Sequence, residues 1–304
     1  MGEQQWQGDL QQMISGYDEG RTDLQWQGYD LCVFKQCWGE LVIALDGGQV
    51  LLFRPLGEQP LLWLSDKPVP APGAIRGGVP VCWPWFAEHV DDASQPKHGV
   101  ARTARWTLDS AEMDAQGGHW RLTPQSSLWD GLTLGLDVSV AQGRLSLSLI
   151  SHNISDQPIA MTQALHSYFA VSDRARVELQ GVDGLLLRDK LQGMQERRHS
   201  GIVEFPVETD VIFQHEGATE VMLVDHGWQR VIGIHKEGGN STVVWNPGDS
   251  AATMPDVGMD QVSRFVCVEA AQTRFYDHPW IAAGETQRLT TTFELLPYPD
   301  KPAD

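Results

Sequence analysis

Short apolar or alternating segments recur along the whole of this chain, and turn residues separate each from the next. Segments 41–45 and 50–53 flank Asp46-Gly47-Gly48, which is typical of a hairpin because aspartate and glycine accept the positive φ angles of tight turns. Segment 132–140 alternates apolar with polar or small residues, and segment 145–149 repeats the pattern. Since a period of two places every second side chain on one face, these segments are predicted to be strands.

Further strand candidates follow at intervals, whereas helical periodicity is nearly absent apart from one short segment at 10–14. Many short strands with few helices must pack sheet on sheet. We therefore expect an all-β fold, built as a large antiparallel β-sandwich with few short helices. The additional candidates are 120–123, 177–179, 221–224, 231–235, 242–245, 265–269 and 289–295.

The proline-rich stretch 68–73 interrupts this pattern. Proline removes a donor from the ladder, so the stretch is excluded from a central strand and is expected to form an extended loop that leads to Arg76. No linker, repeat or low-complexity tract divides the 304 residues, and 41% of them are hydrophobic. We expect residues 1–304 to form a single domain, because all-β domains reach this size.

The formal net charge of −18 excludes several partners. A polyanion would be repelled, which argues against nucleic acid, and acidic membrane surfaces are disfavoured for the same reason. A small anion would need a local basic pocket within this negative surface. Any cluster of cations is therefore more informative here than it would be in a basic protein.

The first 25 residues contain neither an apolar core nor a basic start of the signal-peptide type, and no run of about eighteen apolar residues occurs. The four cysteines, Cys32, Cys37, Cys82 and Cys267, show no CxxC spacing. We expect a cytoplasmic protein with reduced cysteines and without a membrane partner.

Cations and aromatic residues gather in the block RGGVPVCWPWF, residues 76–86, and in KHGVAR, residues 97–102. Arginine binds phosphate oxygens through two parallel hydrogen bonds, lysine adds a point charge, and aromatic rings offer apolar faces to the C–H side of a sugar. The block predicts a site for a phosphorylated sugar. Alternatively, the cations flank a turn at the surface and the aromatic residues belong to the core. The residues concerned are Arg76, Trp83, Trp85, Phe86, Lys97, His98 and Arg102.

Four motifs in order resemble those of the glucose-6-phosphate 1-epimerases, the hexose-6-phosphate mutarotase branch of the aldose 1-epimerase family. They are the RGGVPVCWPWF…HGVAR block, LHSYFAVSD at 165–173, ETD at 208–210 and VCVEA at 266–270. The resemblance implies the galactose mutarotase-like β-supersandwich. It also implies interconversion of the α and β anomers of a hexose 6-phosphate, with glucose 6-phosphate expected.

A mutarotase needs a base for the C1 hydroxyl proton and an acid for the ring oxygen, so a carboxylate and a histidine suffice. Glu269 lies among apolar neighbours that would raise its pKa, and histidine has an unperturbed pKa of about 6.5. Local sequence alone also allows Glu269 to be an edge-strand charge and His166 a half-buried structural histidine. The resemblance assigns Glu269 as the base and His166 as the acid.

For the substrate, we expect Arg76, Lys97 and Arg102 to hold the phosphate. Asp210 matches the family's substrate-binding aspartate, although an ordinary turn residue is the alternative. His98 either binds a sugar hydroxyl or orients Arg102.

The segment Trp245-Asn246-Pro247 resembles the family's WNP segment but continues as Gly248-Asp249-Ser250, so no cation is expected from this loop. The ten histidines show no HxH or HExxH spacing, so we expect neither a metal nor a cofactor. We expect a monomer whose partner is a small-molecule sugar phosphate.

The sequence also allows two other functions. The first is an aldose 1-epimerase for unphosphorylated sugars, which inert arginines at positions 76 and 102 would favour. The second is a non-catalytic carbohydrate-binding protein, which the twelve tryptophans make plausible. The presence of both His166 and Glu269 argues against the second.

Overall fold

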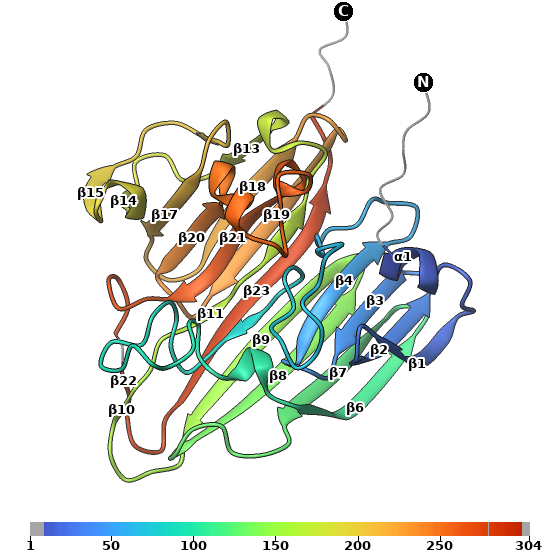
Figure 1. Cartoon of the computed structure of the whole chain (residues 1–304), viewed down its shortest axis with the longest axis horizontal. Helices are drawn as coiled ribbons and strands as arrows, with labels where there is room; N and C mark the ends of the chain where they lie inside the picture. Colours follow the sequence, from blue (N-terminus) through green and yellow to red (C-terminus); the bar gives the residue numbers. More distant parts are fainter. Residues whose placement is uncertain (1–8, 279, 300–304) are drawn as a thin grey trace, which may run out of the picture.

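The computed structural model describes residues 9–278 and 280–299, and within them antiparallel strands form four sheets. The chain begins with the short helix α1 (Asp9–Ile14) and a four-stranded sheet in the order β1-β2-β3-β4. Figure 1 shows this sheet, in blue, beside the green strands β6 to β9. Its strands are β1 (Gly20–Trp26), β2 (Tyr29–Gln36), β3 (Gly39–Ala44) and β4 (Gln49–Pro55).

A nine-stranded sheet runs through the molecule in the order β16-β13-β18-β19-β23-β9-β8-β7-β6. Its central pair is β9 against the long last strand β23, which crosses the molecule diagonally in Figure 1. The strands are β6 (Trp106–Asp114), β7 (Gly117–Pro124), β8 (Leu132–Ala141), β9 (Arg144–Asn153), β13 (Val177–Gln180), β16 (Val203–Glu204), β18 (Thr219–Asp225), β19 (Arg230–Glu237) and β23 (Thr286–Leu296).

An eight-stranded sheet has the order β15-β14-β17-β20-β21-β11-β5, and β12 also pairs with β21. A two-stranded sheet joins β10 (Ile159–Ala160) to β22 (Trp280–Ile281). The strands of the eight-stranded sheet are β5 (Val81–Cys82), β11 (Gln163–Leu165), β12 (Tyr168–Ala170), β14 (Leu186–Asp189), β15 (Gln195–Arg198), β17 (Thr209–Gln214), β20 (Ser241–Asn246) and β21 (Phe265–Gln272).

The main hydrophobic core lies between the eight- and nine-stranded sheets, because each sheet turns one apolar face inward. Val266 and Val268 of β21 contribute to the same buried cluster as Leu147 of β9 and Phe293 of β23. Burial of these side chains is the dominant favourable term in folding. The sandwich therefore leaves the opposite face of the eight-stranded sheet available for other chemistry.

The strands predicted from the sequence are confirmed, and the predicted segment 10–14 lies in α1. Gly47 and Gly48 have φ angles of 81° and 56°, as the expected hairpin turn between β3 and β4 requires. The stretch 68–73 forms no strand, as expected. The cysteines Cys32, Cys37, Cys82 and Cys267 are free thiols. None of the helices in the described ranges is long and apolar enough to cross a membrane.

Candidate active site

Strand β21 places Glu269 on the face of the eight-stranded sheet that points away from the main core. Its neighbours Val268 and Ala270 point into the core between the sheets, whereas Cys267 and Ala271 belong to two smaller apolar clusters on the other face. Glu269 lies between them with an exposed fraction of 1%. The structure therefore excludes the alternative that Glu269 is a solvated charge at a sheet edge.

The backbone register places His166 opposite Glu269. Strands β11 and β12 both pair with β21, with Leu165 opposite Ala270 and Tyr168 opposite Cys267. The register is the same on both sides of the interruption at residues 166 and 167, so His166 takes the position across from Glu269. His166 Nε2 lies 3.4 Å from Glu269 Oε1. The ladder itself thus brings together the two predicted catalytic residues.

Both members of this pair retain a buried polar atom without a partner. His166 Nδ1 and Glu269 Oε2 have no hydrogen-bond partner among the described residues. An unsatisfied buried polar atom costs about 1–3 kcal/mol, and more when the group is charged. Such atoms at adjacent positions are suited to exchange protons and hydrogen bonds with a ligand.

Burial shifts the two pKa values in opposite directions. Desolvation raises the pKa of Glu269 well above its usual range, because the carboxylate is the charged form. Desolvation lowers the pKa of His166 well below its usual range, and the charges of His98, Arg76 and Arg102 act in the same direction. The size of the His166 shift follows from its near-complete burial, with 8% of the residue exposed, beside several basic groups.

Asp210 and Trp245 lie on the same face as Glu269. Asp210 of β17 is directly opposite Trp245 of β20, which is opposite Cys267 of β21. Residues paired in this way share one face of a sheet. Asp210 is therefore a strand residue, which excludes the turn alternative, and burial raises its pKa. Its Oδ1 lies 2.8 Å from Lys190 Nζ.

Arg76 reaches the site in a fixed orientation. Its Nε donates to Asp256 Oδ2 at 2.8 Å, and its Nη1 donates to Tyr168 Oη at 3.1 Å. The ring of Tyr168 stacks on that of His166, with centroids 4.7 Å apart and an interplanar angle of 10°. Arg76 therefore contacts the aromatic ring that supports the histidine, and its charge is already paired with a carboxylate.

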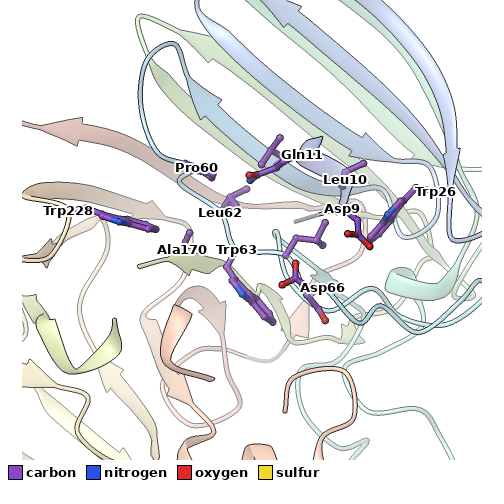
Figure 2. Close-up of a pocket in the computed structure, with 13 residues that line it drawn as sticks. Asp9, Leu10, Gln11, Trp26, Pro60, Leu62, Trp63, Asp66, Ala170 and Trp228 are labelled. Atoms are coloured by element: carbon purple, nitrogen blue, oxygen red, sulfur yellow. The ribbon is translucent and has the colours of Figure 1, made fainter. Parts of the chain in front are cut away.

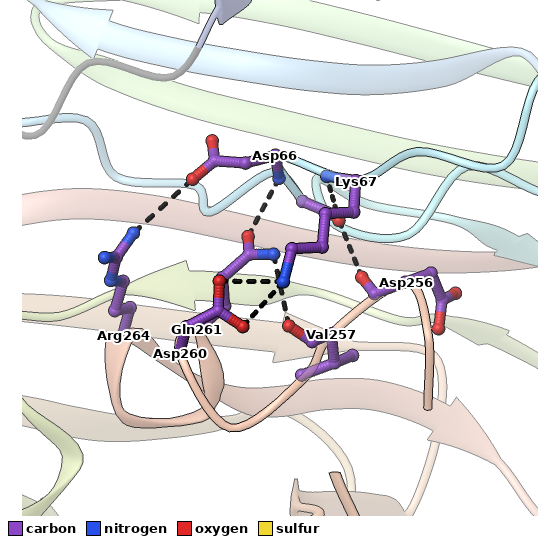
Figure 3. A network of polar contacts seen from close by, with 8 residues as sticks. Asp66, Lys67, Asp256, Val257, Asp260, Gln261 and Arg264 are labelled. Carbon is purple, nitrogen blue, oxygen red and sulfur yellow. Dashed lines mark hydrogen bonds and ion pairs between the residues drawn. The ribbon is translucent and has the colours of Figure 1, made fainter. Parts of the chain in front are cut away.

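Asp256 belongs to a loop that is tied firmly to the loop before Arg76, as Figure 3 shows. Ser65 Oγ donates to the backbone carbonyl of Asp256 at 2.6 Å, and the backbone N–H of Asp66 donates to Gln261 Oε1 at 2.8 Å. Lys67 Nζ bonds both carboxylate oxygens of Asp260 at 2.7 and 2.8 Å. These contacts hold the Asp256 carboxylate in place for Arg76.

His98 lies close to His166, with ring centroids 5.6 Å apart. Its Nδ1 accepts a hydrogen bond from the backbone N–H of Ala87 at 3.2 Å, so the proton of the neutral ring is on Nε2. Burial and the neighbouring cations lower the pKa of His98 to about 2. No hydrogen bond joins His98 to Arg102 in the described parts of the chain. The geometry favours the first of the two roles considered for His98, a donor to a ligand.

Arg102 and Lys97 stand at the rim of the site. Arg102 Nη2 donates to the backbone carbonyl of Lys97 at 2.8 Å. The Lys97 ammonium pairs with Glu88 at 3.0 Å, and both of these side chains are mostly exposed. Arg102 forms no ion pair with a carboxylate of the described residues. It is thus the least neutralised of the three predicted phosphate-binding cations.

The aromatic residues of the first motif divide between core and site. Trp83 is fully buried in the main core and donates to Ser151 Oγ, so it offers no face to a sugar. Trp85 is also buried and packs against His89 and Trp129. Phe86 is partly buried, and its ring lies 5.1 Å from that of His98. The predicted aromatic cluster is therefore mainly structural.

Sequence reasoning missed Lys190, Tyr168 and Asp256. Tyr168 lies within LHSYFAVSD, two residues after His166, and the alternation of a strand would have placed both on one side. Asp256 lies in a loop and Lys190 in a short 3-10 turn, where no periodic signal could show which side chain returns to the sheet. The tertiary fold alone brings them to the site.

A separate apolar pocket lies between α1, the loop around residues 60–66, Ala170 and Trp228, as Figure 2 shows. Leu10, Trp26, Leu62 and Trp63 contribute to its walls. None of the site residues predicted from the sequence lines it. Its apolar lining contrasts with the charged groups around His166 and Glu269.

Comparison with known proteins matches residues 35–294 to the family model of aldose 1-epimerase. The chain is 34% identical over 270 residues to an Escherichia coli K12 protein named "Putative glucose-6-phosphate 1-epimerase", covering 86% of each. It is 34% identical over 249 residues to a Salmonella typhimurium protein of the same name, covering 79% of this chain and 82% of that one. The crystal structure of a "putative mutarotase" from Salmonella typhimurium superimposes with a TM-score of 0.82 at 31% identity, covering 90% of this chain and 93% of that one.

Proposed function

This chain belongs to the aldose 1-epimerase family, and on that premise we propose that it interconverts the α and β anomers of a hexose 6-phosphate, with D-glucose 6-phosphate as the substrate. The observation that carries the proposal is the buried pair of His166 and Glu269, which the strand register places opposite one another. The names of the relatives from Escherichia coli and Salmonella typhimurium support the same substrate class.

The reaction needs only proton transfers. Glu269 accepts the proton of the C1 hydroxyl while His166 donates a proton to the ring oxygen, so the C1–O5 bond breaks and an aldehyde forms. Rotation about the C1–C2 bond presents the other face of the aldehyde. The two proton transfers then run in reverse and close the ring as the other anomer.

The opposite pKa shifts suit this exchange. A raised pKa makes the Glu269 carboxylate a stronger base than an exposed carboxylate, because burial disfavours its charged form. A bound phosphate dianion would offset the positive charges of Arg76 and Arg102, which lower the pKa of His166. Phosphate binding would therefore favour protonation of His166 when the substrate is present.

The phosphate is held by Arg76, Arg102 and Lys97, and His98 donates to a sugar hydroxyl. Arg102 supplies the largest share because it lacks a carboxylate partner, whereas Arg76 pairs with Asp256 and Lys97 with Glu88. We also propose a cytoplasmic location, which the four free cysteines support because disulfides are rare in that compartment.

The decisive experiment is two-dimensional NMR exchange spectroscopy of anomer interconversion, with glucose and glucose 6-phosphate measured side by side. We expect acceleration over the spontaneous rate for both sugars and a higher kcat/KM for the phosphate. A higher kcat/KM for glucose would assign the protein as an aldose 1-epimerase for unphosphorylated sugars. Binding without acceleration would leave a carbohydrate-binding protein.

The phosphate assignment is tested with Arg102→Ala, and with Arg102→Lys as the matched control that keeps a positive charge. A charge-assisted hydrogen bond contributes about 1.5–3 kcal/mol, so kcat/KM for glucose 6-phosphate should fall roughly ten- to a hundredfold in Arg102→Ala. The value for glucose should change little. Equal losses on both sugars would refute the assignment.

A further inference from the structure

Lys190 reaches the site from the end of β14, which is separated from β21 in the sheet by the two strands β17 and β20. It begins the 3-10 turn Lys190–Gln192, in which the Asp189 carboxylate accepts a hydrogen bond from the backbone N–H of Leu191. Asp189 is opposite Val211 in the ladder, so the turn starts beside Asp210. The capped turn and the register fix where the side chain of Lys190 begins.

The ammonium of Lys190 is held between an anion and an aromatic ring. Its Nζ lies 2.8 Å from Asp210 Oδ1 and 5.6 Å from the centroid of the Phe86 ring. The Lys190 and Asp210 side chains are 27% and 22% exposed, so a ligand can reach both. The two charges form a preorganised pair that can offer a donor and an acceptor to one hydroxyl group.

Different neighbours surround the two members of the catalytic pair. The sheet order β14-β17-β20-β21-β11 places Asp210 of β17 and the end of β14, which carries Lys190, on the side of Glu269 that faces away from His166. Glu269 interacts with Lys190 and Asp210, whereas His166 interacts with His98, Arg76 and Arg102. Arg76 and Arg102 lie on the histidine side.

The groups of a hexose 6-phosphate are arranged in a matching order around its ring. The ring oxygen is bonded to C5, which bears the phosphorylated C6, whereas the C1 hydroxyl is adjacent to the C2 hydroxyl. A sugar with its ring oxygen at His166 and its C1 hydroxyl at Glu269 turns its phosphate toward Arg76 and Arg102. The same orientation turns its C2 hydroxyl toward Lys190 and Asp210.

We propose that Lys190 is a specificity-determining residue that binds the C2 hydroxyl of the sugar together with Asp210. The ammonium donates a hydrogen bond to the C2 oxygen, and the Asp210 carboxylate accepts a hydrogen bond from the C2 hydroxyl. This inference rests on the proposed function, because it assigns the ring oxygen to His166 and the C1 hydroxyl to Glu269. It makes the enzyme sensitive to the presence and the configuration of the substituent at C2.

The test compares glucose 6-phosphate with 2-deoxyglucose 6-phosphate in the wild type and in Lys190→Met, by NMR exchange spectroscopy. The variant should lose roughly ten- to a hundredfold in kcat/KM on glucose 6-phosphate, as expected for a lost charge-assisted hydrogen bond. On the 2-deoxy substrate the loss should be less than about threefold, because the partner hydroxyl is absent. The preference for the 2-hydroxyl that the wild type shows should therefore be largely lost in Lys190→Met.

Lys97→Met is the matched control, since Lys97 is a second lysine near His98 that pairs with Glu88 and not with Asp210. Lys97→Met should lower kcat/KM by the same factor on glucose 6-phosphate and on 2-deoxyglucose 6-phosphate. It should therefore leave the preference for the 2-hydroxyl intact. Mannose 6-phosphate has the opposite configuration at C2, so the wild type should have a lower kcat/KM on it than on glucose 6-phosphate. In Lys190→Met the two kcat/KM values should be nearly equal. Thermal unfolding of each variant checks the fold, and Lys190→Arg supplies a second, charge-preserving variant that should retain part of the preference.

Equal losses on the 2-hydroxy and 2-deoxy substrates would overturn the inference, because Lys190 would then act through Glu269 or through the fold. A loss confined to glucose 6-phosphate relative to glucose would also overturn it, because Lys190 would then belong to the phosphate site. A wild type that accelerates no sugar phosphate would instead refute the proposed function itself.

Discussion

The two faces of β21 differ in what they bury. Val266, Val268 and Ala270 point into the hydrophobic core between the two large sheets. Glu269, one residue along, is equally buried on the opposite face but retains a carboxylate oxygen without a partner. The inner face gains stability from burial, whereas the outer face gives up stability to keep a reactive group away from water.

The difference shows why a sandwich can carry acid–base chemistry. Packing on the inner face fixes the strands. The outer face can therefore hold His166 and Glu269 at a defined separation. Substitutions on the two faces should therefore have different consequences. Those on the outer face should change catalysis, and those on the inner face should change the free energy of unfolding.

The largest effect is expected for Glu269→Gln. The amide is nearly isosteric but cannot accept the C1 hydroxyl proton, so turnover should fall by roughly two to four decades. The fold should be preserved, because no buried charge is created. NMR exchange rates at saturating glucose 6-phosphate, corrected for the spontaneous rate, measure the loss. Near wild-type turnover in a folded variant would show that Glu269 is not the base.

Val268, the neighbour of Glu269 on the inner face, should show the opposite behaviour: Val268→Ala should lower stability and leave turnover nearly unchanged. The lost methyl groups and the cavity left behind should lower the free energy of unfolding by about 1.5–3 kcal/mol. Turnover per folded molecule should stay close to that of the wild type. Denaturant titration and the same exchange assay separate the two quantities. A large loss of turnover without destabilisation would contradict the division between the faces.

The pH dependence of stability should sharpen the contrast. The folded pKa of Glu269 is raised above its ordinary value of 4.5, so its contribution to stability is fully present below that pH and is lost as pH rises through the folded pKa. Glu269→Gln removes this dependence, so it should become progressively more stable relative to the wild type as pH rises from 4.5. The deficit of Val268→Ala should not change with pH. Denaturant titrations at pH 4.5, 6 and 7.5 compare the three proteins, and parallel curves for Glu269→Gln and the wild type would contradict the buried-carboxylate interpretation.

The smallest effect is expected for Lys67→Met, beyond the rim of the outer face. Lys67 and Asp260 are about half exposed, and ion pairs of this kind contribute 0 to about 1 kcal/mol. The unfolding free energy should change by less than about 1 kcal/mol, and added salt should reduce the difference further. A substantial loss of kcat/KM on glucose 6-phosphate would show that this pair helps to orient Arg76 through the loop that carries Asp256.

The sequence predicted the strands whose alternation or continuous apolar character reflects burial, such as β8, β9 and β21. Among the strands that it did not predict, β1 alternates largely between half-buried and exposed residues and β15 is exposed at every position. Local periodicity reports burial, so a strand that buries little leaves no signal. Strands β2 and β17 were also missed, although both are largely buried.

The family motifs marked the candidate site, but local sequence placed only part of it on a strand. Glu269 lies on β21, which the sequence predicted, whereas Asp210 lies on β17, which it did not. The partner of Arg76 could not be foreseen, because Asp256 is 180 residues away along the chain. The position of Lys190 depends on a strand pairing for which the sequence offered no periodic evidence.

The catalytic pair and the substrate-binding cations are held by different parts of the backbone, which bears on how such proteins evolve. The spacing of His166 and Glu269 is set by backbone register, whereas Lys97, Arg102 and Lys190 are supplied by turns outside the ladder. Mutation can lengthen, shorten or replace those turns without shifting the strands that hold the reactive pair. A lineage built on this sheet can therefore diversify in the sugars it accepts while it inherits the same proton-transfer apparatus unchanged.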